Sequence, residues 1–181
     1  MPRRPILLAL AVAVATTFAV VVLVQATRPA GSPDATGATA GRAETGKPAP
    51  AVVGTTLDGQ PFDLASLAGK PVVINFWGPS CVPCRDEFPL FKAKLAEHAA
   101  DGLSIVGVLM DDPVEPAKAF AAQYDASWPT VVDPNKQLET AYRVAARPQT
   151  YFVDRNGVLR SIQIGEITDQ LFERQYEQIA K

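Results

Sequence analysis

An uncharged apolar run stands near the start of the chain. Residues 6–24 are mostly Ala, Val and Leu, and Arg3 and Arg4 precede them. As a helix they would cover ~28 Å, close to the thickness of a bilayer's hydrocarbon core. Because basic residues stay on the cytoplasmic side, residues 1–26 predict a membrane anchor that leaves the rest of the chain outside the cytoplasm. A cleaved signal peptide is the alternative, since Val24-Gln-Ala26 has the small-residue pattern of a cleavage site.

Residues 27–48 have the composition of a linker. They are Ala, Gly, Thr, Pro and Ser with a few charges, and they include no large apolar residue. Such a segment cannot bury enough apolar surface to offset the entropy lost on folding. We expect a flexible tether between the apolar run and a folded domain, and a stub left after signal cleavage is the alternative.

The folded domain is expected at residues 49–181, where short apolar strands alternate with segments of helical period. Strands are expected at 72–76, 103–109, 130–132, 149–153 and 158–164, and helices at 81–100, 115–124, 138–142 and 168–180. Residues 52–53 and 62–64 flank an Asp58-Gly59 turn and predict an additional N-terminal hairpin. This order of elements indicates an α/β sandwich with a mixed sheet.

Two of the expected helices have distinct local signals. In helix 81–100, Phe88, Phe91, Leu95 and Ala99 recur at a spacing of three to four and predict one buried face. Thr168 precedes the last helix and is expected to be its N-cap.

The chain has 2 cysteines, 1 histidine and a formal net charge of −2. These residues are too few for a zinc site with four Cys and His ligands or for a cysteine-bound iron–sulfur cluster. Cys84 is followed by Arg85, which excludes a C-x-x-C-H haem attachment motif. The net charge gives no basic footprint for nucleic acid. We therefore expect no metal, no nucleic acid and no cofactor other than a redox-active disulfide.

The candidate chemistry lies at Cys81-Val-Pro-Cys84, between a buried strand and a helix. A C-x-x-C pair in this setting is typical of a redox motif, because the helix N-terminus favours a thiolate at Cys81 that can attack a disulfide. Cys84 lies one turn further in and would attack the resulting mixed disulfide. An inert disulfide and a zinc half-site shared across a dimer are the alternatives, although so short a loop gains little stability from a disulfide.

The stretch Asn75-Phe-Trp-Gly-Pro-Ser-Cys-Val-Pro-Cys-Arg-Asp-Glu-Phe-Pro89 resembles the active site of TlpA/ResA/CcmG-type (DsbE-like) proteins. These are membrane-linked, thioredoxin-like thiol–disulfide oxidoreductases of the bacterial cell envelope. The resemblance covers residues 47–181 and includes residues 62–70 and 147–154. It implies an α/β thioredoxin-like three-layer sandwich with a mixed central sheet. It also implies an N-terminal hairpin extension and an inserted strand and helix before a cis-proline.

The same resemblance implies a function for individual residues. Cys81 would be the attacking cysteine, Cys84 the resolving one, and Pro148 the cis-proline beside them, with Pro129 as the rival candidate. A proline that merely starts a strand is the alternative for Pro148. The residues expected to bind the substrate or to modulate the site are Trp77, Pro83, Arg147 and Gln149. Trp77 would be an active-site lid in the family sense, and packing of its ring in the core is the alternative.

Glu87 is the candidate proton acceptor. It follows Cys84 by three residues, so helical spacing places it on the same side, and its position matches a glutamate of ResA-like active sites. A partly buried carboxyl group there would have a raised pKa and could accept the proton of Cys84. Asn75 stands where thioredoxin has a buried aspartate, so Glu87 is the substitute for that base. A solvated glutamate without a function is the alternative.

Arg147 is a departure from the family pattern, which has a smaller or apolar residue before the cis-proline. A guanidinium group near the sulfurs would favour the thiolate, lower the pKa of Cys81 and make the pair more oxidising. An arginine that points into solvent is the alternative.

We therefore expect an exported thiol–disulfide oxidoreductase, anchored through residues 6–24 or secreted after signal cleavage. The resemblance implies that it reduces apocytochrome c before haem attachment, and that a membrane donor of the CcdA/DsbD type re-reduces it. An envelope oxidase that introduces disulfides into exported proteins is the alternative.

Two other classes of protein fit the sequence less well. A peroxidase of the peroxiredoxin type needs Pro and Thr or Ser at set distances before the cysteine, where this chain has Ile74 and Gly78. A copper chaperone of the Sco type needs C-x-x-x-C and a distant histidine, whereas this chain has C-x-x-C and His98.

Overall fold

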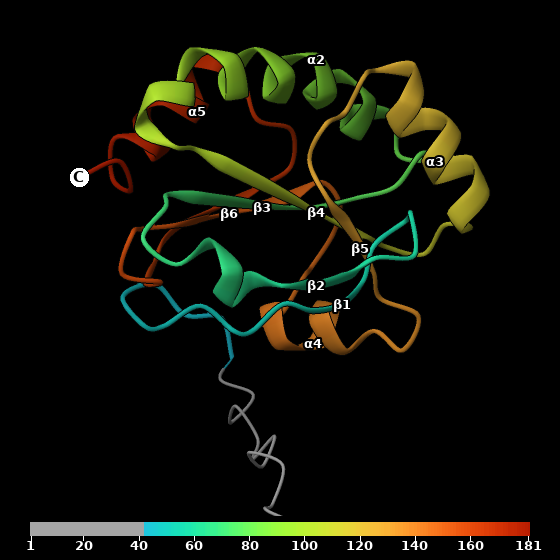
Figure 1. Cartoon of the computed structure of the whole chain (residues 1–181), viewed down its shortest axis with the longest axis horizontal. Helices are drawn as coiled ribbons and strands as arrows, with labels where there is room; N and C mark the ends of the chain where they lie inside the picture. Colours follow the sequence, from blue (N-terminus) through green and yellow to red (C-terminus); the bar gives the residue numbers. More distant parts are fainter. Residues whose placement is uncertain (1–41) are drawn as a thin grey trace, which may run out of the picture. The chain divides into compact units, whose positions relative to one another are not determined.

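The computed structural model describes residues 42–181, which form a three-layer α/β sandwich (Figure 1). A five-stranded sheet has the order β5-β4-β3-β6-β7, with β3, β4 and β5 parallel and β6 and β7 antiparallel to their neighbours. The strands are β1 Val53–Thr55, β2 Pro61–Asp63, β3 Val72–Trp77, β4 Ser104–Leu109, β5 Thr130–Val132, β6 Gln149–Val153 and β7 Leu159–Ile164. The helices are α2 Val82–Glu97, α3 Val114–Gln123, α4 Gln137–Tyr142 and α5 Asp169–Tyr176, with short 3₁₀ helices at Leu64–Leu67 and Ala99–Asp101. The expected fold class is confirmed.

Strand β3 is the centre of the sheet and leads directly to the C-x-x-C motif. All six of its residues are buried, because both neighbouring strands and helices on both faces cover it. A continuous apolar run is the pattern expected of such a strand. Helices α2, α3 and α5 pack on one face of the sheet, and α4 packs on the other (Figure 1).

Aromatic packing holds α2 against the sheet and so places its N-terminus. The ring of Phe88 lies 4.6 Å from that of Trp77, 4.8 Å from Phe120 and 5.2 Å from Trp128, measured between centroids. The contacts join α2 to β3, to α3 and to the loop before β5. The predicted burial of Phe88 and Phe91 is confirmed.

Two helix predictions were wrong in detail. Helix α2 ends at Glu97 rather than at residue 100, so Ala99 falls in a 3₁₀ turn and is exposed. Lys94, which was not predicted to be buried, lies on the buried face of α2. The carboxylates of Glu97, Asp169 and Glu173 bind its ammonium group there. The last helix ends at Tyr176 rather than at residue 180, and Thr168 is its N-cap as predicted.

Residues 43–48 belong to the folded domain, although their composition predicts that they are part of the linker. The N–H of Ala43 donates to the carbonyl of Ala141, and Gly46 and Lys47 pair with the backbone of Leu159. Within the described residues, the outer edge of β7 has backbone N–H and C=O groups without a neighbouring strand, and the N-terminal segment forms hydrogen bonds with them. The composition of the segment does not indicate that such an edge is available. The expected N-terminal hairpin is confirmed by the antiparallel pairing of β1 with β2.

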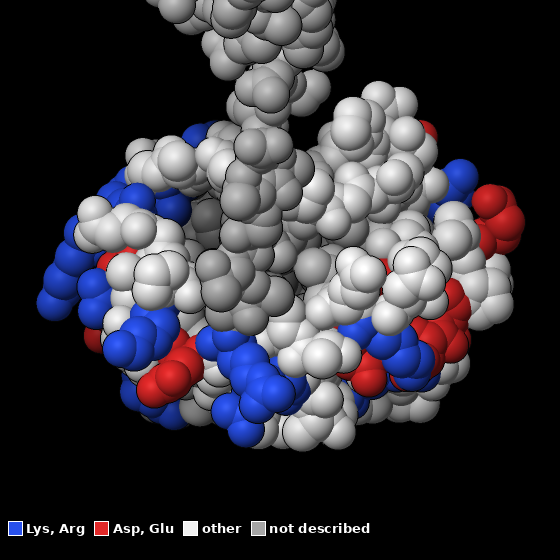
Figure 2. All heavy atoms as spheres, turned by 90° about the horizontal axis from the view of Figure 1, so that it is seen from below, with Lys and Arg blue, Asp and Glu red and all other residues white. Residues whose placement is uncertain are grey.

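The predicted anchor at residues 6–24 lies outside the described residues. Within residues 42–181, no helix combines the length and the apolar character that a membrane span requires. On the face shown in Figure 2, basic and acidic side chains both occur. Lys136, for example, pairs with Asp111 and Glu139.

Tyr142 joins α4 to the N-terminal segment, because its buried hydroxyl group donates to the carbonyl of Pro50 at 2.6 Å. Tyr142→Phe leaves that buried carbonyl without its donor, and we expect the free energy of unfolding to fall by about 1–2 kcal/mol. Urea denaturation measures the change. Tyr124→Phe is the control, since the hydroxyl group of half-buried Tyr124 makes no hydrogen bond within residues 42–181. Equal losses in both variants would contradict the assignment.

Candidate active site

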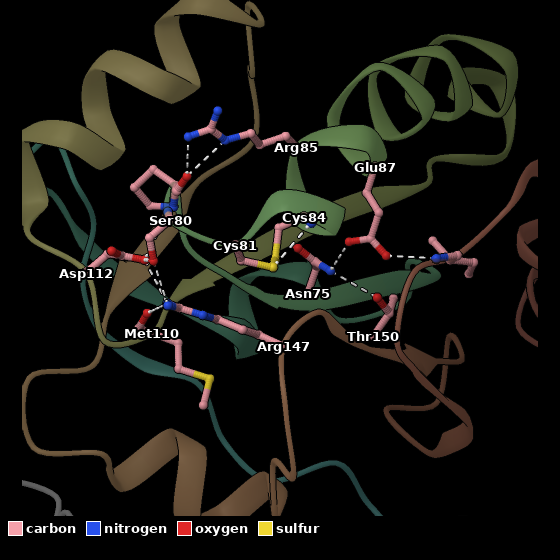
Figure 3. Close-up of a disulfide and its surroundings, with 12 residues drawn as sticks. Asn75, Ser80, Cys81, Cys84, Arg85, Glu87, Met110, Asp112, Arg147 and Thr150 are labelled. Atoms are coloured by element: carbon pink, nitrogen blue, oxygen red, sulfur yellow. Dashed lines mark hydrogen bonds and ion pairs between the residues drawn. A yellow bond between two sulfur atoms is a disulfide. The ribbon is translucent and has the colours of Figure 1, made fainter.

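Cys81 and Cys84 form a disulfide at the N-terminus of α2 (Figure 3). Cys81 is the N-cap residue, and its sulfur accepts the N–H of Cys84 at 3.2 Å. The two cysteines differ in access, since Cys81 is 8% exposed and Cys84 is 0% exposed. Cys81 is therefore the more accessible of the two cysteines, and its assignment as the attacking residue stays a prediction.

Glu87 is fully buried, and both of its carboxyl oxygens accept hydrogen bonds. Oε1 accepts the N–H of Ile167 at 2.9 Å, and Oε2 accepts from Nδ2 of Asn75 at 3.2 Å. Asn75 also donates to the hydroxyl group of Thr150 at 3.0 Å, so β3 and β6 together hold the amide in place (Figure 3).

Burial raises the pKa of Glu87 to about 8. The hydrogen bonds from Ile167 and Asn75 oppose this shift, and the nearby charge of Glu166 adds to it. A carboxyl group with this pKa exchanges protons near neutral pH, and its affinity for a proton is close to that of an ordinary thiol. The raised pKa expected for Glu87 is therefore present, with burial as its main cause.

The Arg147–Pro148 peptide bond is cis, and all other peptide bonds within residues 42–181 are trans. Pro148 is buried, and its carbonyl accepts the N–H of Gly165 at 2.9 Å. Gln149 follows it in β6, but its side chain is 3% exposed and bridges the N–H of Ala145 and the hydroxyl group of Tyr151. The side chain of Gln149 thus holds the loop before Pro148 in place. Because its amide group is already hydrogen-bonded, it is not available to bind a substrate, contrary to the prediction.

Of the two alternatives for Trp77, an active-site lid and core packing, the structure shows core packing. The side chain of Trp77 is 0% exposed and packs against Phe88 and Phe120, because β3 extends one residue further than predicted and carries the ring into the core. Pro83 is half-buried in the first turn of α2, as its lack of an N–H allows. Between the cysteines, Val82 is 68% exposed and gives the motif an apolar outer surface.

Arg147 is neither directed at the sulfurs as a free cation nor turned into solvent. Its Nη1 lies 2.7 Å from the carboxylate of Asp112 and donates to the carbonyl of Met110, and its Nη2 donates to the hydroxyl group of Ser80 at 2.8 Å. Neither Asp112 nor Ser80 was predicted from the sequence as a site residue. The one available signal for Asp112 was its place just after a buried parallel strand, next to the end of β3.

One group of side chains within the described residues has the types of atoms that bind metals. The ligand atoms of Glu97, His98 and Glu173 lie within 4.8 Å of one another. Both glutamates already bind the ammonium group of Lys94, so a metal ion would have to displace a buried cation. The absence of a metal or cofactor stays a prediction.

A disulfide at a helix N-terminus, a buried carboxyl group behind it and a cis-proline in a neighbouring loop, all on this sheet, define a thioredoxin-like thiol–disulfide oxidoreductase. The chain belongs to the AhpC/TSA family, whose sequence profile matches residues 45–162. Curated relatives and solved structures of similar fold confirm the resemblance to ResA-type and DsbE-type proteins.

Two curated relatives carry related names. The thiol-disulfide oxidoreductase ResA of Geobacillus kaustophilus is 34% identical over 134 residues, which cover 74% of this chain and 77% of the relative. The thioredoxin-like protein YneN of Bacillus subtilis is 34% identical over 137 residues, covering 74% and 79%.

Solved structures agree on the fold. A thiol:disulfide interchange protein of Chlorobium tepidum is 26% identical with a TM-score of 0.69, and the match covers 77% of this chain and 99% of that one. A secreted disulfide oxidoreductase of Mycobacterium tuberculosis, homologous to DsbE of E. coli, is 26% identical with a TM-score of 0.62, covering 70% and 94%.

Proposed function

We propose that this oxidoreductase works outside the cytoplasm, held at the membrane by residues 6–24, and reduces disulfides of exported proteins. The substrate class is the C-x-x-C-H disulfide of apocytochrome c, which must be a dithiol before haem attaches. The apolar run behind a basic start supports export. The ResA-named relatives and the secreted M. tuberculosis neighbour support the same setting.

The observation that carries the proposal is the buried Glu87, which follows the buried Cys84 by three residues in α2. In the reduced protein, the Cys81 thiolate attacks one sulfur of the substrate disulfide and expels the other as a thiolate, which takes up a proton. Glu87 in its ionised form, which makes up about half of the protein near pH 8, then takes the proton of the Cys84 thiol. The Cys84 thiolate attacks the sulfur of Cys81 and expels the second substrate thiolate. Two electrons pass to the substrate, and the Cys81–Cys84 disulfide forms.

A pKa of about 8 suits Glu87 to this step, since an ordinary thiol titrates in the same range. Proton transfer between two groups of similar proton affinity has little free-energy cost in either direction. The same residue can therefore return the proton to Cys84 when the disulfide is reduced again.

Re-reduction requires a second protein. The chain has 2 cysteines, both in the motif, so it has no third thiol with which to open its own disulfide. We propose a membrane electron donor of the CcdA/DsbD type, because residues 6–24 would keep the domain close to such a donor.

The test is the reduction of a disulfide-bonded C-x-x-C-H peptide by the full-length reduced protein, together with the redox potential of the Cys81–Cys84 pair. We expect stoichiometric reduction and a potential near thioredoxin's, about −270 mV. A potential near that of DsbA, about −120 mV, with net oxidation of the reduced peptide, would support an envelope oxidase instead. The Cys81→Ser variant is the control for reduction that does not use the motif.

A further inference from the structure

Asp112 links three loops that meet beside Cys81. Its Oδ2 accepts from Nη1 of Arg147 at 2.7 Å and from the hydroxyl group of Ser80 at 2.9 Å. The N–H of Ser80 points at the same oxygen at 3.4 Å. Asp112 comes from the loop after β4, Arg147 from the loop before the cis-proline, and Ser80 immediately precedes Cys81 (Figure 3).

The Asp112–Arg147 pair lies close against the active-site turn and is largely shielded from water. The side chains of Asp112 and Arg147 are 11% and 22% exposed. A Cβ atom at Gly78 would collide with Oδ2 of Asp112 and with Nη1 of Arg147. The turn that leads to Cys81 therefore needs glycine at this position for the pair to fit, and charges so little exposed to water are weakly screened.

The neighbouring charged groups have hydrogen-bond partners of their own, although the charge of Arg147 also acts on Asp111. Asp111 has its own partner, Lys136, at 2.6 Å. Arg85 uses its Nε and Nη2 to bind the carbonyl of Pro79. At Cys81 the positive charge of Arg147 is thus balanced by Asp112, and each charge would be exposed to the sulfur if the other were removed.

We propose that Asp112 is a positioning residue that neutralises Arg147 and thereby sets the redox potential of the Cys81–Cys84 pair. This inference rests on the oxidoreductase function, and it does not depend on which protein is the substrate. A free guanidinium group beside Cys81 would stabilise the thiolate, and a stabilised reduced form makes a disulfide more oxidising. Asp112 therefore keeps the pair on the reducing side, where the proposed function requires it.

The test is a double-mutant cycle in the full-length protein, with the redox equilibrium against glutathione and the pKa of Cys81 as readouts. For Asp112→Asn, we expect the equilibrium to shift about threefold or more towards the reduced protein and the pKa of Cys81 to fall by about 0.5. For Arg147→Gln, we expect shifts of similar size in the opposite direction. The double variant should return to within twofold of the wild-type equilibrium, because both charges are gone.

The matched control is the exposed ion pair of Lys92 and Asp125, which lies on α2 and after α3. Asp125→Asn and Lys92→Gln make the same changes in charge and should leave the equilibrium unchanged. The inference is overturned if Asp112→Asn and Arg147→Gln leave the equilibrium unchanged, shift it in the same direction, or fail to compensate in the double variant. If Asp112→Asn does not fold, the direction in which Arg147→Gln alone shifts the redox equilibrium still tests the inference.

The two proposals can fail separately. The glutathione equilibrium uses no exported protein, so its result concerns only the Asp112–Arg147 pair. Failure of the wild-type protein to reduce the C-x-x-C-H peptide, with the cycle behaving as described, would reject the substrate class and leave the function of Asp112 standing.

Discussion

Cys84→Ser is expected to stop turnover and to leave Cys81 joined to its substrate as a mixed disulfide. Cys81 is the more accessible of the two cysteines, and Cys84 has no exposed surface. Without the thiol of Cys84, the covalent intermediate has no internal group to resolve it. We expect multiple-turnover disulfide reduction to fall by at least about a thousandfold in both Cys81→Ser and Cys84→Ser.

The two variants differ in what they capture. In cells, Cys84→Ser should accumulate adducts that disappear on treatment with a reducing agent, whereas Cys81→Ser should give none. Non-reducing electrophoresis and mass spectrometry of the adducts would identify the partner. Adducts of equal amount in the two variants would contradict the assignment of Cys81 as the attacking residue.

Glu87→Gln is expected to slow the exchange roughly a hundredfold near pH 8, where the wild-type carboxyl group is partly ionised, because the proton of Cys84 then has no acceptor in the protein interior. The loss should lie in the resolution step, so the mixed disulfide should persist longer than in the wild type. Rapid-quench trapping of the adduct measures this directly. The control is Asp86→Asn on the exposed side of the same helix, which should exchange at the wild-type rate.

The same variant should change how stability depends on pH. The pKa of Glu87 is about 8 in the folded protein and about 4.5 when exposed, so between these values the folded state holds a proton that the unfolded state has lost. The free energy of unfolding of the oxidised protein therefore falls as the pH rises through this window.

Between pH 5 and pH 8, the titration of Glu87 lowers the free energy of unfolding by about 3 kcal/mol. Denaturant titrations of the wild type and of Glu87→Gln at these two pH values should show that the variant has lost this part of the decrease. An unchanged pH dependence would mean that the carboxyl group titrates near its ordinary value.

The sequence predicted most of the fold because each strand and helix carries its own signal. The run Val72–Trp77 is apolar throughout, so a central strand followed from it directly. The Asp58-Gly59 turn gave the N-terminal hairpin in the same way. Helix ends were less accurate, since the positions at which α2 and α5 stop depend on local capping.

The candidate site was predictable where its residues are neighbours in the chain. Cys81, Cys84 and Glu87 share one side of a helix start, and their spacing is enough to group them. Trp77 and Gln149 were expected, from the family resemblance, to bind the substrate or to modulate the site. Their side chains point into the interior instead, and sequence adjacency does not specify that direction.

The sequence by itself determined the redox motif, the order of strands and helices, and the scarcity of other reactive groups. Only the tertiary structure decided the environment of each charged group. Ile167 and Asn75 meet the carboxyl group of Glu87 from two other parts of the fold, and Asp112 meets Arg147 across 35 positions of sequence. The physical reason is that hydrophobic periodicity indicates which side of a helix or strand is buried. It does not indicate which polar group of another element will lie opposite, and that partner sets both the charge balance and the pKa.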